Sequence, residues 1–111
     1  MNRIVVKKEE ALKRLFKGVS LDSLAVGERS MVTKMNYKAG DFATLHTHPH
    51  EQCGYVVSGR YRLIVEAAEP VDTLLSAGDS YAIPGLVPHS FEVLEGGEVV
   101  DVFTPHREDY L

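Results

Sequence analysis

The feature that most constrains the fold is a series of short strand-forming runs that fills the chain from Ser30 onward. Val, Ile, Tyr, Phe and Thr are common in these runs, and Gly, Pro or Asp interrupt them roughly every ten residues, a spacing typical of antiparallel sandwiches and barrels. The pattern therefore predicts an all-β antiparallel fold of about eight strands. The expected strands are residues 30–37, 42–48, 52–57, 61–66, 71–75, 80–83, 89–94 and 98–103.

The beginning of the chain has a different pattern. In residues 9–18, the apolar side chains of Leu12, Leu15 and Phe16 follow i, i+3, i+4 spacing, acidic residues precede basic ones, and a glycine could cap the end. This pattern predicts a short N-terminal helix. Residues 7–24 could equally contain an edge strand, so the barrel is expected to carry a helix or a strand as its N-terminal extension.

Composition excludes several classes of protein. A chain of 111 residues has room for one domain, so residues 1–111 are expected to form a single domain. The formal charge is −4 and the basic residues are scattered, which argues against a nucleic-acid partner. No apolar run reaches the ~18 residues of a membrane-spanning helix. One cysteine, Cys53, excludes an internal disulfide and favours a cytoplasmic location.

Histidines are concentrated in one segment, where His46, His48 and His50 lie within five residues of each other. Side chains alternate along a strand, so His46 and His48 are expected on one face, from which both imidazoles can reach one metal ion. The pair alone is a weak signal. His50 is next to a proline turn and is expected at the surface or packed behind the site, and His106 is expected to be solvated.

Two further residues could complete a metal site. Gln52 has the same parity as His46 and His48 after a bend at Pro49, and its amide oxygen could be the third ligand. His89 follows a proline-rich turn far along the chain and could be the fourth.

Two segments resemble the sequence motifs of the cupin family. Residues 40–59 keep every spacing of the first motif, Gly-x5-His-x-His-x3–4-Glu-x6-Gly, but carry Gln52 in place of the glutamate. Residues 78–93 resemble the second motif, Gly-x5-Pro-x-Gly-x2-His, with Leu86 at its second glycine and Val93 at its later asparagine.

This resemblance implies a small single-domain cupin, which is an antiparallel jelly-roll barrel with a metal near its centre. It implies ligation of one divalent ion, Mn, Fe, Co, Ni or Zn, by His46, His48, Gln52 and His89. A neutral glutamine would leave the ion its full charge and make it a strong Lewis acid. Small cupins are often homodimers through their N-terminal strands, and the same is expected here.

A narrower resemblance is to the KdgF-type pectin-degradation cupins, which are metal-dependent and open the ring of 4,5-unsaturated monouronates. It rests on residues 46–52 and on the tail, residues 101–111. Matched residue by residue, Asp101, Phe103 and Arg107 fall on the active-site positions of that family.

The tail residues can also be interpreted from strand parity. Asp101 and Phe103 share one strand face. If that face points inward, the Asp101 carboxylate needs a partner, because burying an unpaired charge is expensive. Arg107 could be that partner, or it could bind a substrate carboxylate through two parallel hydrogen bonds. The alternative is an outward Asp101 with Arg107 in a surface salt bridge.

The remaining candidates are assigned to packing. Cys53 and Tyr55 have parity opposite to Gln52, so they are expected to contact the second sheet or a partner, away from the metal. Tyr61 and Tyr81 are interpreted as packing residues without a chemical role.

The expected activity is metal-assisted isomerisation or tautomerisation of a small carboxylated sugar, such as an unsaturated uronate. One alternative is a metal-dependent dioxygenase that acts on an enolic substrate at the same site. The other is a non-catalytic module that binds a small molecule and is stabilised by its metal.

Overall fold

The computed structural model describes residues 4–111, so the first three residues of the predicted domain lie outside the described part. This part contains ten strands and two 3-10 helices, Lys8–Glu10 and Glu108–Tyr110. The strands are β1 (Leu12–Phe16), β2 (Val19–Val26), β3 (Met31–Tyr37), β4 (Phe42–His46), β5 (Glu51–Val56), β6 (Arg60–Val65), β7 (Val71–Leu75), β8 (Ser80–Ile83), β9 (His89–Glu95) and β10 (Gly97–Thr104).

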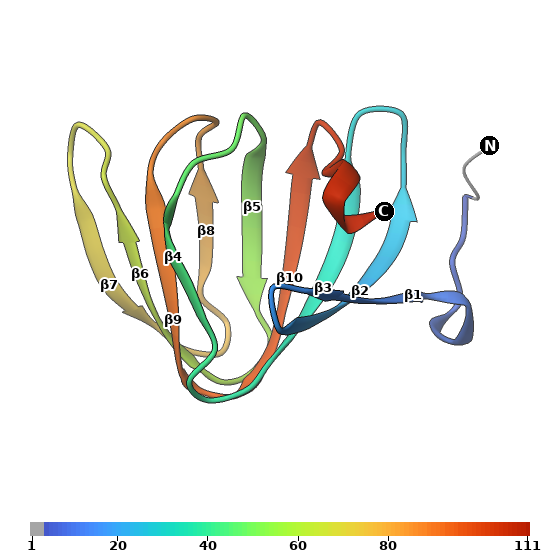
Figure 1. The fold of residues 1–111 in the computed structure, drawn as a ribbon, viewed down its shortest axis with the longest axis horizontal. Coiled ribbons are helices and arrows are strands. Elements are labelled where there is room, and N and C mark those ends of the chain that lie inside the picture. The colour runs from blue at the N-terminus through green and yellow to red at the C-terminus, as the bar shows by residue number, and fades with distance from the viewer. Residues whose placement is uncertain (1–3) are drawn as a thin grey trace.

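The strands form two sheets that face each other (Figure 1). One sheet has six strands in the order β1-β2-β3-β10-β5-β8, and the other has four in the order β4-β9-β6-β7. All pairings are antiparallel. From β3 to β10 the chain changes sheet at every connection except the β6–β7 hairpin. This crossing pattern confirms the predicted all-β antiparallel jelly-roll barrel.

The core lies between the two sheets, where alternate residues of each strand point inward. Tyr61 and Val99 are fully buried from opposite sheets. The Tyr61 ring stacks on Phe91 with the ring centroids 5.0 Å apart, and Tyr37 packs edge-on at 5.6 Å. Apolar side chains therefore fill the body of the barrel, and the polar side chains of the candidate site lie toward one end of it.

The predicted helix over residues 9–18 is wrong. β1 pairs with β2 from Leu12–Ser23 to Phe16–Val19, and Lys17 and Gly18, both at positive φ, form the turn between them. Two successive residues at positive φ are characteristic of the turn that suits the twist of a hairpin. Helical spacing was misleading because Leu12 and Leu15 are exposed and define no buried face. The edge-strand alternative, and hence the strand extension, is correct.

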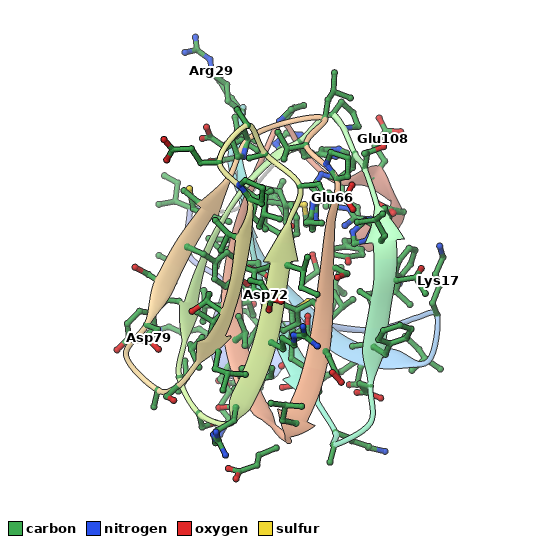
Figure 2. All side chains as sticks on the ribbon, turned by 90° about the vertical axis from the view of Figure 1, so that its left-hand side faces the viewer. Lys17, Arg29, Glu66, Asp72, Asp79 and Glu108 are labelled. Carbon is green, nitrogen blue, oxygen red and sulfur yellow. The ribbon has the colours of Figure 1, made fainter. Side chains whose placement is uncertain are left out.

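Four strand ends lie together at one end of the barrel, the upper end in Figure 1. They are the end of β4, the starts of β5 and β9, and the end of β10. Figure 2 shows Arg29, Glu66 and Glu108 at this end and Asp79 toward the other. The candidate site residues come from these four strand ends.

Candidate metal centre

Three histidines from two strand ends and one turn meet at this end of the barrel. His46 ends β4 and is paired in register with His89, the first residue of β9, while His48 lies in the turn that follows β4. One ring nitrogen from each histidine lies within 4.8 Å of the others. The three side chains are thus close enough to share one metal ion.

Backbone carbonyls determine how these rings are oriented. Each of the three histidines places Nδ1 within hydrogen-bond distance of a main-chain oxygen. Because a carbonyl only accepts, each Nδ1 carries the proton and each Nε2 keeps a free lone pair. Outer partners of this kind orient histidine ligands in metal sites. The pairs are His46–Thr44 at 2.6 Å, His48–His50 at 3.0 Å and His89–Val87 at 2.9 Å.

Two of the three imidazoles, those of His48 and His89, are kept neutral by their surroundings, and one of their free nitrogens has no protein partner. Burial lowers the pKa of His89 to about 4, and its Nε2 is buried without a hydrogen bond. Burial also lowers the pKa of His48, and the charge of Arg107 acts in the same direction. Neutral imidazoles with an unsatisfied buried lone pair fit a metal cation, which would supply the missing partner.

Gln52 stands beside the histidines at the start of β5. Its Oε1 lies 3.2 Å from Nε2 of His48, so two acceptor atoms face each other. Its amide group hydrogen-bonds Asp101 and Tyr81 on the other side. Because a carboxylate accepts, the NH2 group must face Asp101, and this turns the amide oxygen toward the histidines. The oxygen is therefore oriented to be a fourth ligand.

His46 and His48 do not lie on one strand, as was predicted from their parity, although the two side chains do meet. β4 ends at His46, and His48 belongs to the turn, where its carbonyl accepts a hydrogen bond from the Leu86 amide at 2.8 Å. The bend at Pro49 begins earlier than the strand pattern indicated, because a proline cannot continue the ladder.

Asp101 points into the barrel from β10 and is 1% exposed. Its partners are the Tyr81 hydroxyl, which donates to Oδ1 at 2.6 Å, and the amide of Gln52. Burial raises the pKa of the Asp101 carboxyl to about 6, although these two hydrogen bonds and the charge of Arg107 act to lower it. The alternative of an outward Asp101 is wrong.

Arg107 follows β10 and is nine-tenths buried, with a different carboxylate as its partner. Its Nε and Nη2 donate to the two oxygens of Asp109 at 3.2 and 2.7 Å. The guanidinium lies over the rings of Tyr110, Phe103 and Phe16. Of the partners considered for Arg107, Asp101 is therefore not the one observed, and the carboxylate that Arg107 binds is that of Asp109, two residues along the chain.

The other predicted residues are distributed as follows. Phe103 is buried in the core, with its ring centroid 6.0 Å from that of His48. His50 is half-buried and its Nε2 lies 3.0 Å from the carbonyl oxygen of His106. The His106 ring in turn contacts the carbonyl of Gly27.

Three interpretations of packing residues have different outcomes. Tyr61 is a core residue, as predicted, and its hydroxyl donates to the Ser58 carbonyl at 2.7 Å. Tyr81 was assigned to packing alone, but its hydroxyl contacts Asp101. Cys53 and Tyr55 are exposed on the outer face of the six-stranded sheet, so they do not contact the second sheet.

Two cavities adjoin the site, and Arg107 contributes to the lining of both. A cavity of about 50 Å³ inside the barrel is lined by His46, Gln52, His89 and Asp101, among others. A larger open groove of about 640 Å³ runs between the turn 47–50 and the tail 105–109. The inner cavity has room for little more than a water or two, whereas the groove has room for a sugar-sized molecule.

Comparison with known proteins identifies the family. Residues 33–104 match the Cupin domain family. The chain belongs to the cupin family. Sequence motif and jelly-roll topology therefore agree, and the three-histidine cluster lies where the two cupin motifs meet.

Individual relatives are similar over almost the whole chain. The pectin degradation protein KdgF of Dickeya dadantii is 27% identical over 113 aligned positions, which cover all of both chains. The structure of an RmlC-like cupin from Shewanella frigidimarina superposes with a TM-score of 0.87 at 29% identity, over 98% of this chain and 96% of the other. KdgF from Halomonas sp. superposes with a TM-score of 0.84 at 28% identity, over 96% and 99%.

Among the described residues, no helix is long and apolar enough to cross a membrane.

Proposed function

We propose that this cupin is a metal-dependent isomerase that opens the ring of a small unsaturated uronate. The observation that supports this most is the joining of two groups of residues at one end of the barrel. Three histidines and the Gln52 oxygen lie together where they could hold a cation, and Asp101 lies beside Gln52. Similarity to two proteins named KdgF supports a substrate derived from pectin.

In this proposal, His46, His48, His89 and Gln52 hold one divalent ion, which is Mn, Fe, Co, Ni or Zn. The ion supplies Lewis-acid stabilisation of negative charge on a substrate oxygen. The donor set of three nitrogens and one neutral oxygen adds no negative charge of its own. It suits borderline divalent metals without selecting one of them.

The protein's own groups have to move a proton. Opening a 4,5-unsaturated uronate ring removes a proton from the anomeric hydroxyl, breaks the bond between C1 and the ring oxygen, and adds a proton at C4. The composition of the sugar does not change. Asp101 is the carboxyl group we assign to this transfer, because it is inward-facing, buried and one hydrogen bond away from Gln52.

Substrate binding is assigned to the groove beside the site. Arg107 lines both the groove and the inner cavity, so it can hold a carboxylate in the groove while the reacting end of the sugar faces the histidines. Asp109 now occupies the Nε and Nη2 donors, and a substrate carboxylate would exchange with it or use the remaining N–H groups. Phe103 forms an apolar wall between Arg107 and His48.

The test is a panel of 4,5-unsaturated monouronates, incubated with protein of measured metal content under air and under argon. Proton NMR should show loss of the vinyl signal of the ring at equal rates in both atmospheres. Conversion that requires oxygen would instead identify a dioxygenase. Binding without conversion would identify a non-catalytic module.

We also propose that the protein is a cytoplasmic homodimer that binds no nucleic acid. Its free cysteine suits a reducing compartment. Leu15 on β1 is 75% exposed, and Tyr55 on the outer sheet face is also exposed, so apolar surface is available to a second copy. Analytical ultracentrifugation tests the dimer, and a monomer at micromolar concentration would contradict it.

A further inference from the structure

Tyr81, Gly54 and Asp101 lie side by side on three neighbouring strands of the six-stranded sheet. In register, Gly54 of β5 pairs with Tyr81 of β8 on one side and with Asp101 of β10 on the other. Neighbouring strands are ~4.8 Å apart, so β8 and β10 are separated by about 10 Å. A hydrogen bond between their side chains must therefore cross the strand between them.

The Tyr81 side chain makes this crossing. Its hydroxyl donates to Oδ1 of Asp101 at 2.6 Å and is also hydrogen-bonded to the Gln52 side chain. Burial and the charge of Asp101 raise the pKa of the Tyr81 phenol well above its usual value, so the phenol keeps the proton that it donates. The direction of this hydrogen bond is thus determined, from Tyr81 to the carboxylate.

Gly54 provides the space that the crossing needs. A Cβ atom at this position would lie 2.1 Å from Cζ and 2.4 Å from the hydroxyl oxygen of Tyr81, and 2.5 Å from Oδ1 of Asp101. Non-bonded carbon and oxygen atoms do not approach so closely, so any other residue would displace the ring, the carboxylate or both. The glycine is required by the two side chains that meet above it.

We infer that Tyr81 and Gly54 together position the Asp101 carboxylate, with Tyr81 as a positioning residue and Gly54 as the gap through which it acts. This inference rests on the proposed function, in which Asp101 transfers the proton. Tyr81 restricts rotation of the carboxylate, and Gln52 holds it from a second direction, next to the metal ligands. A carboxylate held in this way keeps one orientation during turnover, which is what proton transfer in a fixed geometry needs.

The main test is Tyr81→Phe, which removes the hydroxyl and keeps the ring. The matched control is Tyr61→Phe, because Tyr61 is also inside the barrel but donates to the Ser58 carbonyl and does not contact Asp101. On an unsaturated uronate, Tyr81→Phe should lower kcat by about ten- to hundredfold, a part of the 10²–10⁴-fold that a general base supplies. KM and bound metal per chain should stay as in the wild type, and Tyr61→Phe should leave kcat unchanged.

A second variant, Gly54→Ala, tests the gap. It should lower kcat at least as much as Tyr81→Phe, and the double variant should lose less than the product of the two effects, because both act on the same carboxylate. Multiplicative effects would overturn the role of the gap. If Gly54→Ala does not fold, Tyr81→Phe decides alone.

The outcomes separate this inference from the proposed function. An active wild type whose Tyr81→Phe variant keeps its kcat, or loses activity only in proportion to lost metal, overturns the inference alone. A metal-loaded wild type that converts no unsaturated uronate overturns the proposed function, and the positioning role with it.

Discussion

The guanidinium carbon of Arg107 lies 4.0 Å from the ring centre of Tyr110, and its Nη1 donates to the hydroxyl of that tyrosine at 3.1 Å. Asp109 takes two further N–H groups, and Phe103 lies on another side of the guanidinium. The last turn of the chain therefore determines where this cation sits at the mouth of the barrel. Whatever Arg107 binds must approach through the groove that it lines.

Replacement of Arg107 should affect binding more than chemistry. Arg107→Ala is expected to raise KM for an unsaturated uronate by about ten- to a hundredfold with little change in kcat, since a charged hydrogen-bonded pair contributes ~1.5–3 kcal/mol to ground state and transition state alike. Arg107→Lys should restore little, because an ammonium group cannot form the two parallel bonds. Steady-state kinetics checks this, and a fall in kcat at unchanged KM would contradict it.

Removal of one histidine ligand should remove the metal. His89→Ala is expected to lower metal content sharply, because the buried Nε2 of His89 faces the other two histidines without a protein partner. Chelation of the wild type should lower Tm by about 10 °C or more, if the ion is present at a hundred times its Kd. Elemental analysis and thermal unfolding measure the two effects.

The control for this experiment is His106→Ala. His106 contacts the Gly27 carbonyl and is not part of the three-histidine cluster, so its variant should keep its metal and its response to chelation. Equal metal content in the His89 and His106 variants would refute the assignment of the site.

Most of the barrel could be predicted from sequence, because period-two alternation and turn residues are local signals. The runs 71–75 and 80–83 are observed with the predicted bounds as β7 and β8, and the others differ by one or two residues at an end. The N-terminal hairpin was not predictable in the same way. β1 exists because it pairs with β2, and this tertiary pairing overrides the helical spacing of an exposed segment.

In the candidate site, too, local sequence signals predict some features, and others depend on tertiary pairing. The cupin motifs were sufficient to predict that His46, His48 and His89 share one site, because each motif is a continuous stretch of chain that its spacing reveals. No local pattern could show that Tyr81 reaches Asp101, since their neighbourhood follows from the strand order β10-β5-β8. Gly54, which pairs with both residues, was the only related signal we recognise in the sequence. Its role can be interpreted only when the strand register is known.

Gln52 offers a test of the neutral ligand. Gln52→Glu should keep the metal, or bind it more tightly, and should lower kcat. A glutamate would partly neutralise the ion, remove the NH2 group that faces Asp101, and place a second negative charge beside that carboxylate. Metal analysis combined with turnover per bound ion checks the prediction. An unchanged kcat would mean that the neutral amide is incidental.

Asp22 provides a prediction that concerns stability instead of chemistry. Its side chain is 4% exposed and lies in one row between Lys13 of β1 and Lys34 of β3, at 3.0 and 3.4 Å. Burial opposes the ionisation of Asp22, but hydrogen bonds and charge from both lysines outweigh it, and the pKa is lowered from its usual value. A lowered pKa means that the folded state favours the ionised form of Asp22 more than the unfolded state does. The ion pairs therefore stabilise the fold at pH values above the pKa of this carboxyl in the unfolded chain, ~3.9.

Asp22→Asn should accordingly lower the free energy of unfolding by about 1–2 kcal/mol at pH 7. The difference from the wild type should shrink as pH falls below ~4 and the wild-type carboxylate takes up its proton. Asp72→Asn is the matched control, since both Asp72 oxygens are likewise paired with a cation, Arg62, but on the exposed face of the four-stranded sheet, where Figure 2 shows Asp72. Solvent screens exposed pairs so that they contribute little, and this variant should therefore unfold close to the wild type. Urea denaturation from pH 3 to 7 measures both, and a difference for Asp22→Asn that persists unchanged at pH 3 would show that its charge is not what stabilises the hairpin.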